Sequence, residues 1–412
     1  MATIIKQSFY LLTIFSILIS CKEEKRIVEK IDFKTNYKFS WGIESQLEKD
    51  TTSWKHQISA WAYASKGDYK NTLIQQGMDK KGEDLNFTSN QIDSINAIYN
   101  KVNASDYIVE QSKENQIIII NEDHTNTLHR VYIRSLLKRL YENGYKNFGY
   151  EALSYQDNLD SLQHIRKYPV RKSILYKDPQ LGNIVREAIE IGYTVFAYEA
   201  QSEDALHSRG KEREIEQAQN IQKRIAANPN EKFLIHCGWS HNYEGVIGGN
   251  WEKAMAARLT EYTGINPLTI DQIAFSEKGN SKFNDPLLKA LNITESTIIL
   301  NKDDSPFKGE KRNGWRDISL FHPNTNYING RPDWLFQNGN KNVSIEFTNI
   351  DIEFPVMVLA FKKGEDIKIA IPVDITEVTS NIEECHLGLK IGGYTIVVTN
   401  GNESLKFEQN VK

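Results

Sequence analysis

Apolar runs that end in polar, titratable residues recur through the middle of the chain. The clearest is the run of four isoleucines at 117–120, which is followed closely by Glu122, Asp123 and His124. A short continuous apolar run predicts a strand buried on both faces, as in a parallel sheet. Two carboxylates and an imidazole would then lie at the carboxyl end of that strand, where open α/β sheets bind their ligands.

An amphipathic helix and a second strand follow. Leucine, isoleucine and tyrosine recur every three or four positions between Leu128 and Tyr141, and Asn143-Gly144 is a typical helix end. The next strand, at 147–150, leads directly into Glu151. This order predicts a right-handed parallel crossover unit with Glu151 beside the end of the first strand.

The same alternation continues to about residue 275. We predict further strands at 193–198, 232–237 and 267–270, with helices at 184–191, 212–227 and 250–262. Glu199 follows the first of these strands, and Gly238-Trp239-Ser240-His241 follows the second. Titratable groups at successive strand exits are hard to explain by packing. We therefore expect residues 107–275 to form an α/β domain, with a mostly parallel sheet, flanking helices and a site at the strand ends.

The flanking regions have different textures. Residues 21–106 predict a tether and then a helical segment, with a helical hairpin within 54–78. Residues 283–412 predict a small β-sandwich-like domain, with strands at 343–347, 356–361, 367–371 and 394–398 separated by glycine turns. An aromatic segment at 315–336, within a stretch rich in Pro, Asn and Gly, predicts either packing between domains or an exposed ligand or glycan platform.

Composition narrows the function classes. The chain has 412 residues, 40% of them hydrophobic, which suffices for two or three domains with real cores. The formal net charge of -4 gives no electrostatic case for a nucleic-acid partner. The sequence has no glycine-rich phosphate loop, Gly-x-Ser-x-Gly elbow or Cys-x-x-Cys pair, which disfavours nucleotide use and serine-hydrolase chemistry.

The N-terminus predicts export. Lys6 precedes an apolar run at 9–19 of signal-peptide length, and the chain continues as Ser20-Cys21. Residues 1–20 with Cys21 resemble a bacterial lipoprotein signal, in which Cys21 is lipidated and becomes the mature N-terminus. Lys22-Glu23-Glu24 resembles the surface-export signal of Bacteroidetes lipoproteins. We expect a lipid-anchored outer-membrane protein, with surface exposure as the further expectation, and free thiols at Cys237 and Cys385.

The strand-end motifs together resemble the erythromycin-esterase-like, ChaN-like haem-uptake and TIKI-type superfamily over about residues 110–275. The first motif there is usually Gly-Glu-x-His, and this chain has Asn121-Glu122-Asp123-His124; the second, Gly-x-x-His, is intact at 238–241. Arg213-Glu214, which opens a helix, completes the resemblance. It implies a site made of Glu122, His124, Glu151 and His241.

Three functions are compatible with such a site. The first is a hydrolase of a small-molecule or peptide ester or amide, in which the four residues bind a divalent metal or activate water directly. The second is a haem or iron-compound receptor with an imidazole or tyrosine as axial ligand, and the third is a scaffold without catalysis. We expect the substrate to contact further residues around the strand ends, namely His129, Glu199, Arg213, Trp239 and Tyr243. His236 is expected to be a hydrogen-bonded core imidazole.

Overall fold

The structure is a computed structural model that describes residues 28–34, 37–78, 83–153, 158–170, 177–204, 210–347 and 350–412. The expected signal peptide and Cys21 lie outside these residues. Within the described part of the chain, no helix is both long enough and apolar enough to cross a membrane.

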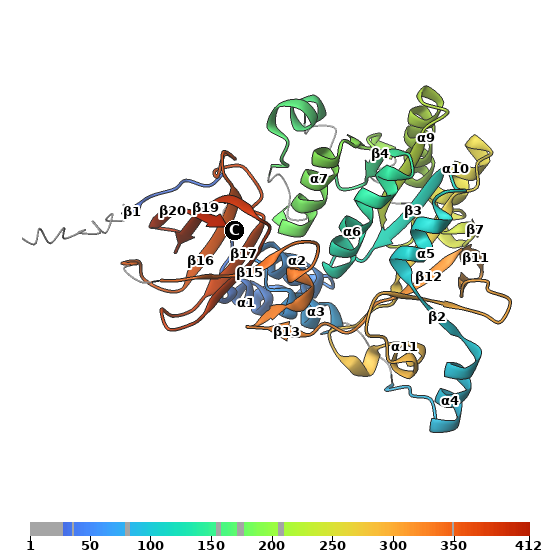
Figure 1. Cartoon of the computed structure of the whole chain (residues 1–412), viewed down its shortest axis with the longest axis horizontal. Helices are drawn as coiled ribbons and strands as arrows, with labels where there is room; N and C mark the ends of the chain where they lie inside the picture. Colours follow the sequence, from blue (N-terminus) through green and yellow to red (C-terminus); the bar gives the residue numbers. More distant parts are fainter. Residues whose placement is uncertain are drawn as a thin grey trace, which may run out of the picture.

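An eight-stranded sheet forms the centre of the molecule, in the order β2-β9-β12-β8-β3-β6-β4-β5 (Figure 1). The strands from β12 to β5 are parallel, and β9 and β2 add antiparallel at one edge. The mostly parallel α/β fold is therefore confirmed. The strand bounds are β2 Asn100–Asn103, β3 Ile117–Glu122, β4 Tyr145–Tyr150, β5 Thr194–Phe196, β6 Lys232–Gly238, β8 Leu268–Phe275, β9 Thr297–Leu300 and β12 Ile318–Phe321.

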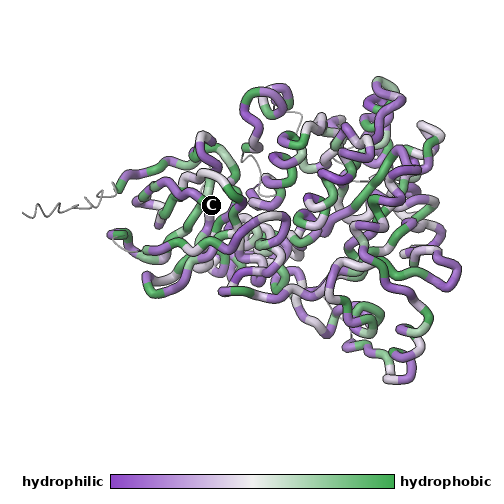
Figure 2. Tube along the Cα trace, viewed as in Figure 1, coloured by the Kyte–Doolittle hydropathy of each residue, from purple (hydrophilic) through white to green (hydrophobic). Residues whose placement is uncertain are grey.

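Helices cover both faces of this sheet, which explains the four isoleucines of β3. Ile118 and Ile120 belong to the core that includes residues of α5 (Ala104–Gln111), α6 (Leu128–Glu142) and α7 (Pro179–Ile191). Ile117 and Ile119 belong to the core beneath α9 (Lys211–Ala227) and α10 (Met255–Thr263). Because successive strand residues point to opposite faces, all four isoleucines are buried when helices cover both sides of the strand. Figure 2 shows the resulting hydrophobic stretches along the central strands.

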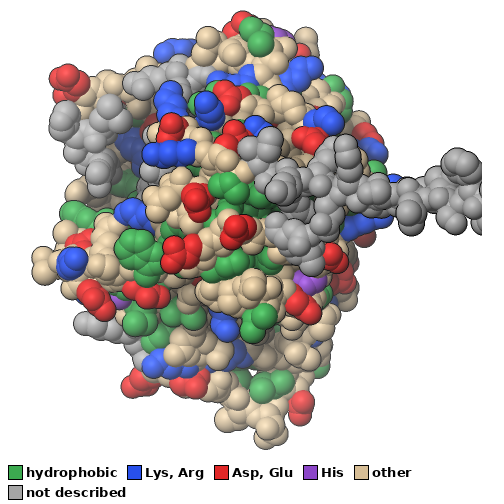
Figure 3. Space-filling model, turned by 90° about the vertical axis from the view of Figure 1, so that its left-hand side faces the viewer, with side chains coloured by type: hydrophobic (Ala, Val, Ile, Leu, Met, Phe, Trp, Pro, Cys, Tyr) green, Lys and Arg blue, Asp and Glu red, His purple; other side chains and the backbone are tan. Residues whose placement is uncertain are grey.

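The C-terminal part is a sandwich of two antiparallel sheets. One has five strands in the order β1-β20-β19-β16-β17, and the other pairs β15 with β18. Apolar side chains from both sheets form one shared core. The bounds are β1 Val28–Glu29, β15 Lys341–Ile345, β16 Val356–Lys362, β17 Asp374–Val378, β18 Cys385–Leu389, β19 Gly392–Thr399 and β20 Ser404–Val411. On the end of the molecule that faces the reader in Figure 3, acidic and basic side chains are interspersed.

Two features differ from the sequence-based expectation. Strands β9 and β12 fall within 283–412 but pair in the eight-stranded sheet, so the C-terminal strands of the sandwich begin only at β15, and β1 joins them from the N-terminal end. Short apolar runs look alike whichever sheet they join, and pairing partners leave no trace in periodicity. The strand expected at 367–371 is a turn, in which Ala370 makes one isolated bridge to Val170.

The N-terminal helices connect the two domains. The hairpin expected within 54–78 is α2 (Lys55–Ser65) with α3 (Tyr69–Met78), preceded by α1 (Ser40–Lys49) and followed by α4 (Ser89–Ile98). Lys66, at the end of α2, pairs with Glu377 of the sandwich at 2.9 Å. Gln76 of α3 donates to Asp123 of the α/β domain. The remaining elements are short: β7 Glu244–Val246, α11 Pro286–Leu291, β10 Gly309–Lys311, β11 Asn313–Arg316, β13 Tyr327–Ile328 and β14 Arg331–Pro332.

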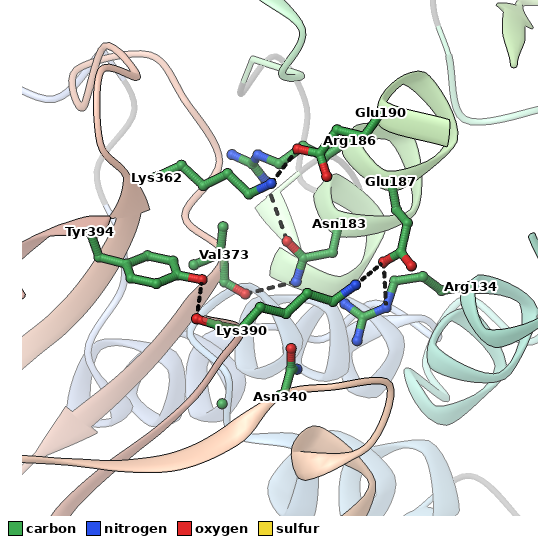
Figure 4. A pocket seen from close by; sticks show the side chains of 11 residues that line it. Arg134, Asn183, Arg186, Glu187, Glu190, Asn340, Lys362, Val373, Lys390 and Tyr394 are labelled. Carbon is green, nitrogen blue, oxygen red and sulfur yellow. Dashed lines mark hydrogen bonds and ion pairs between the residues drawn. The ribbon is translucent and has the colours of Figure 1, made fainter. Parts of the chain in front are cut away.

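Ion pairs join α7 to the sandwich (Figure 4). The Arg186 guanidinium is buried and donates to both carboxylate oxygens of Glu365, at 2.7 and 2.8 Å. Lys390 Nζ lies 2.8 Å from a carboxylate oxygen of Glu187 in the same seam. A bidentate, buried pair of this kind fixes relative orientation because both hydrogen bonds must be made at once.

Candidate functional site

The register of the sheet gathers three strand ends. Glu122 of β3 lies opposite Gly238 of β6, and Tyr150 of β4 lies opposite His236 of the same strand. Glu151, one residue beyond Tyr150, therefore comes next to Gly238, and its carboxylate accepts the Gly238 N–H. The structure therefore brings Glu122, Gly238 and Glu151 together, as the sequence predicts.

Glu122 is a buried carboxylate held by a buried arginine. Arg130 donates from Nε and Nη2 to the two carboxylate oxygens of Glu122, each at 2.7 Å, and from Nη1 to Asp178. His236 Nε2 lies 3.2 Å from the same carboxylate. Burial by itself would raise the pKa of Glu122, but Arg130 and His236 outweigh it and hold that pKa well below its usual range. Glu122 is therefore an acceptor only.

This carboxylate fixes the orientation of His124. Nδ1 of His124 lies 2.8 Å from Glu122 Oε1. Because an ionised carboxylate cannot donate, Nδ1 carries the proton and Nε2 is left as the basic nitrogen. The His124 side chain keeps 19% of its surface exposed, whereas the Glu122 side chain keeps 1%. The oriented imidazole is thus the part of this pair that a substrate can reach.

Gly238 provides the space for that imidazole. A Cβ atom at position 238 would lie 2.5 Å from His124 Nε2 and closer still to Cε1. The same atom would lie 3.3 Å from Glu151 Oε2. Any other residue at 238 would push the ring out of place, so glycine is required here by close approach of a side chain.

A second charged group faces the first. Arg213, near the start of α9, donates to Glu151 at 2.7 Å and to Glu199 at 3.0 and 2.5 Å. Glu199 also accepts from the Gln217 side chain at 3.0 Å. Glu199 and Arg213, both expected to contact the substrate, therefore lie together beside Glu151.

His241 completes this second group. Its Nδ1 lies 2.9 Å from Glu214, and its Nε2 lies 3.1 Å from Arg213 Nη1 and 3.5 Å from Glu151. The ring of Trp251 stacks on the imidazole with centroids 4.8 Å apart. Arginine can donate to Nε2 only while the imidazole is neutral. A protonated His241 would instead turn its N–H toward Glu151.

Neighbouring charges shift the pKa values of Glu151 and His241. Burial would raise the pKa of Glu151, but His241 and Arg213 lower it to about 2. Burial would lower the pKa of His241, but Glu151 and Glu214 outweigh it and raise that pKa. The protonated form of His241 is thus more favoured than that of a free imidazole.

Strained backbone lies between the two groups. Trp239 has φ +48°, a left-handed conformation that is uncommon for a bulky residue. Its N–H donates to the Glu122 carbonyl at 2.8 Å, and its own carbonyl accepts from Asn121 at 2.8 Å and Arg316 at 3.0 Å. Backbone strain held by so many bonds is characteristic of functional sites. Asn121, which stands where the family motif has glycine, helps to hold this backbone through its hydrogen bond to the Trp239 carbonyl.

Trp239 also lines a recess of about 450 Å³. Its walls include Tyr243, Ile273, Phe275 and Phe307. Tyr243 lies here and not against His241, and the Arg316 guanidinium covers one face of its ring at 3.7 Å. Tyr243, which we expect to contact the substrate, lies in the wall of this recess.

Two residues near the motif are structural. His129 is fully buried, accepts the Asp123 N–H at Nδ1 and has Ser276 at Nε2, 2.9 Å away. Asp123 accepts from the backbone and side chain of Thr125. The expectation that His129 lines the substrate site is therefore wrong, because both ring nitrogens are committed inside the core.

The sequence analysis assigned no site role to Arg130, Glu214, Asp178 or Trp251, although Glu214 belongs to the Arg213-Glu214 motif. One signal existed for Arg130. It lies in the first turn of α6, where the helix dipole disfavours a cation, so a specific anionic partner had to be near. Glu214 in the first turn of α9 gives no such signal, because an acidic residue is ordinary there. His236 was expected in the core, and it also contacts the Glu122 carboxylate.

The sequence predicts that Glu122, His124, Glu151 and His241 would hold a metal if one is bound. Glu122 faces Arg130, and Glu151 faces Arg213, so a guanidinium occupies the position in front of each carboxylate. Among the residues the structure describes, no three or more His, Cys, Asp or Glu side chains are arranged to hold a metal ion.

Comparisons with known proteins give limited information. No protein family and no curated protein matches the chain. Among solved structures, the type III effector HopBA1 is similar at 11% identity and TM-score 0.32, over 53% of this chain and 94% of that one. RRSP, a MARTX toxin effector domain from Vibrio vulnificus, is similar at 16% identity and TM-score 0.27, over 49% of this chain and 44% of that one. Both neighbours are bacterial effector or toxin domains; at these TM-scores their activities say nothing about this chain, and the superfamily resemblance stays a prediction.

Proposed function

We propose that the protein is a hydrolase of an ester or amide bond, with His124 as general base. The observation that carries the proposal is the pair formed by Glu122 and His124. A buried, ionised carboxylate fixes Nδ1–H at 2.8 Å and leaves Nε2 basic, on an imidazole that remains partly exposed. This is the arrangement that general-base catalysis by histidine requires.

The reaction follows from the positions of the charged groups. His124 Nε2 takes a proton from water while the water oxygen bonds to the carbonyl carbon. Arg213 Nη1 lies 3.1 Å from His241 Nε2, and in this proposal its guanidinium stabilises the negative oxygen of the tetrahedral intermediate. When the bond to the leaving oxygen or nitrogen breaks, His241 in its protonated form supplies the proton that the leaving group needs. The proton on His124 then returns to His241 through solvent, so the cycle closes.

The substrate class is suggested by the recess beside Trp239. Its walls combine apolar Ile273, Phe275 and Phe307 with the paired Arg316 and Asp271. A peptide side chain or acyl group with apolar carbon atoms fits such walls better than a highly charged ligand. We therefore favour a small-molecule or peptide substrate with an apolar group next to the scissile bond.

Anchoring to the outer membrane is a separate part of the proposal. It depends on the Leu18-Ile19-Ser20-Cys21 pattern and predicts that Cys21 carries the lipid. Incorporation of labelled palmitate into the natural chain, and its loss in Cys21→Ala, is the expected result. Equal labelling of both chains would refute the assignment.

The catalytic proposal is tested with the purified full chain, nitrophenyl esters of increasing acyl length and fluorogenic peptides. We expect His124→Asn and His241→Asn to reduce turnover by roughly 10²–10⁴ while unfolding temperatures stay close to that of the natural chain. His164→Asn is the matched control, because its side chain is 70% exposed and remote from the strand ends. Turnover that survives His124→Asn, or no turnover on any member of the panel, would overturn the proposal.

A further inference from the structure

A second pocket, of about 240 Å³, lies between helix α6 and the loops at 294–296 and 323–337. We call it the polar pocket, and define it by Tyr132, Trp334, Thr294, Asn324, Asp333 and Gln337. The last four come from the loops, and Trp334 belongs to the aromatic segment that the hydrolase proposal does not use. None of the groups of the candidate active site lines this pocket.

The walls are polar but carry no cation. Among the described residues that line it there is no Lys, Arg or His, and most of the wall side chains are amides and hydroxyls of Asn, Gln, Ser and Thr. An anionic ligand would meet no positive charge, and a purely apolar ligand would leave these groups without partners. Amides and hydroxyls both donate and accept, so they suit a ligand that also does both.

The floor is apolar. Leu128 and Tyr132 of α6 and the indole of Trp334 line the pocket and are each more than nine-tenths buried. Tyr69 packs on Trp334 with ring centroids 5.0 Å apart, which holds the indole in place. An aromatic and aliphatic floor below polar walls matches a ligand with C–H surface on one side and hydroxyls around its edge.

The walls are held in place and still have free groups. Trp334 Nε1 donates to Thr325 at 3.1 Å, and the Asn324 carbonyl oxygen accepts from Asn284 at 3.1 Å. Within the described chain, the side-chain amide of Gln337 and the hydroxyl of Thr294 make no hydrogen bond of their own. Preorganised walls with unused donors and acceptors lower the entropic cost of binding a polar ligand.

Two carboxylates at the pocket provide further hydrogen-bond acceptors. Asp333 accepts from Asn326 at 3.3 Å with one oxygen, and Glu295 accepts from Asn103 at 2.8 Å with one oxygen. Each carboxylate has a second oxygen that can accept from a ligand hydroxyl. A divalent cation is not favoured, since no group of three or more ligating side chains is arranged for one in the described residues.

We propose that the polar pocket binds a neutral sugar unit, as a saccharide or as part of a glycan. The inference is independent of the hydrolase proposal, because it uses other residues and requires no turnover. A peptide segment is the rival occupant, since its amides also donate and accept.

The test measures calorimetric binding of neutral sugars to the full chain: glucose, galactose, mannose, N-acetylglucosamine and their β-linked disaccharides, with a tetra-glycine peptide as the rival probe. We expect at least one sugar to bind, and Gln337→Ala to weaken that binding tenfold or more. Ser135→Phe, which fills the pocket from α6, should abolish it. Glu151→Gln is the matched control, and it should leave sugar binding unchanged while removing turnover.

Each outcome decides the matter. Sugar binding that Gln337→Ala weakens and Glu151→Gln spares supports the proposal whether or not the chain hydrolyses anything. Binding of the peptide alone, binding of no sugar at millimolar concentration, or equal sugar affinity in Gln337→Ala would overturn it. Gln337 is exposed, so Gln337→Ala should fold even if Ser135→Phe does not.

Discussion

Replacing Arg130 by methionine should destabilise the α/β domain by about 3–5 kcal/mol, the usual cost of breaking a buried ion pair from one side. Arg130 makes two 2.7 Å bonds to Glu122 and a further bond to Asp178, and all three side chains are at least 97% buried. Methionine fills a similar volume but satisfies neither carboxylate. Both would be left buried and without their cation, which is the dominant loss.

The matched control lies on the same helix. Arg139 bonds Asp106 at 2.8 Å, but these side chains are 43% and 72% exposed. Water screens that pair, so Arg139→Met should cost no more than about 1 kcal/mol. The comparison separates the effect of burial from the effect of losing an arginine on α6.

Urea unfolding followed by circular dichroism gives the midpoints and slopes for both variants. Adding Glu122→Gln to Arg130→Met removes one unpaired buried charge and should restore at least about 1 kcal/mol of the free energy of unfolding. The effects of the two neighbouring substitutions would then not be additive. The reasoning fails if Arg130→Met costs no more than Arg139→Met, or if Glu122→Gln only adds to the damage.

Three further predictions concern other parts of the molecule. Gly238→Ala should cost about 1–3 kcal/mol by overpacking and abolish turnover, whereas Gly42→Ala, with open space at its Cβ, should be neutral by thermal unfolding and assay. Because the folded pKa of Glu151 is about 2, below its unfolded value, its stabilising effect is complete above about pH 4.5 and disappears as the pH falls toward 2; Glu151→Gln should flatten this acid limb in pH-dependent melting, and an unchanged limb would contradict the assignment. Arg186→Met should release the sandwich from α7 by leaving Glu365 unpaired, which limited proteolysis would detect as cleavage between the domains; a digestion pattern identical to that of the natural chain would contradict this.

Much of the fold could be predicted because burial on both faces leaves a distinctive pattern. The isoleucines of β3 and the polar residues directly after them fix both a central strand and the edge at which chemistry collects. The same reasoning placed Glu151 and His241 beside them; the sheet register brings Glu151 next to Gly238, and His241 lies 3.5 Å from Glu151. The four motif residues do meet in space.

The rest depends on long-range pairing, which periodicity does not encode. Nothing in the residues around Ile298 or Ile318 says that they join the parallel sheet and not the sandwich. Likewise, the position of Arg130 in the first turn of α6 indicates an anionic partner, but not that this partner is Asp178, 48 positions away. His129 shows the converse error, since closeness to a motif in sequence did not make it part of the site.

The pairing of β1 with β20 has a consequence for the order in which the chain can fold. Glu29 is opposite Ser404, so the first described strand waits for nearly the whole chain to be made. At 5–20 residues per second, that delay is about 20–75 s. Strand β1 can therefore pair only once β20 is present, and a stop codon that removes only β20 would also leave β1 without its partner strand.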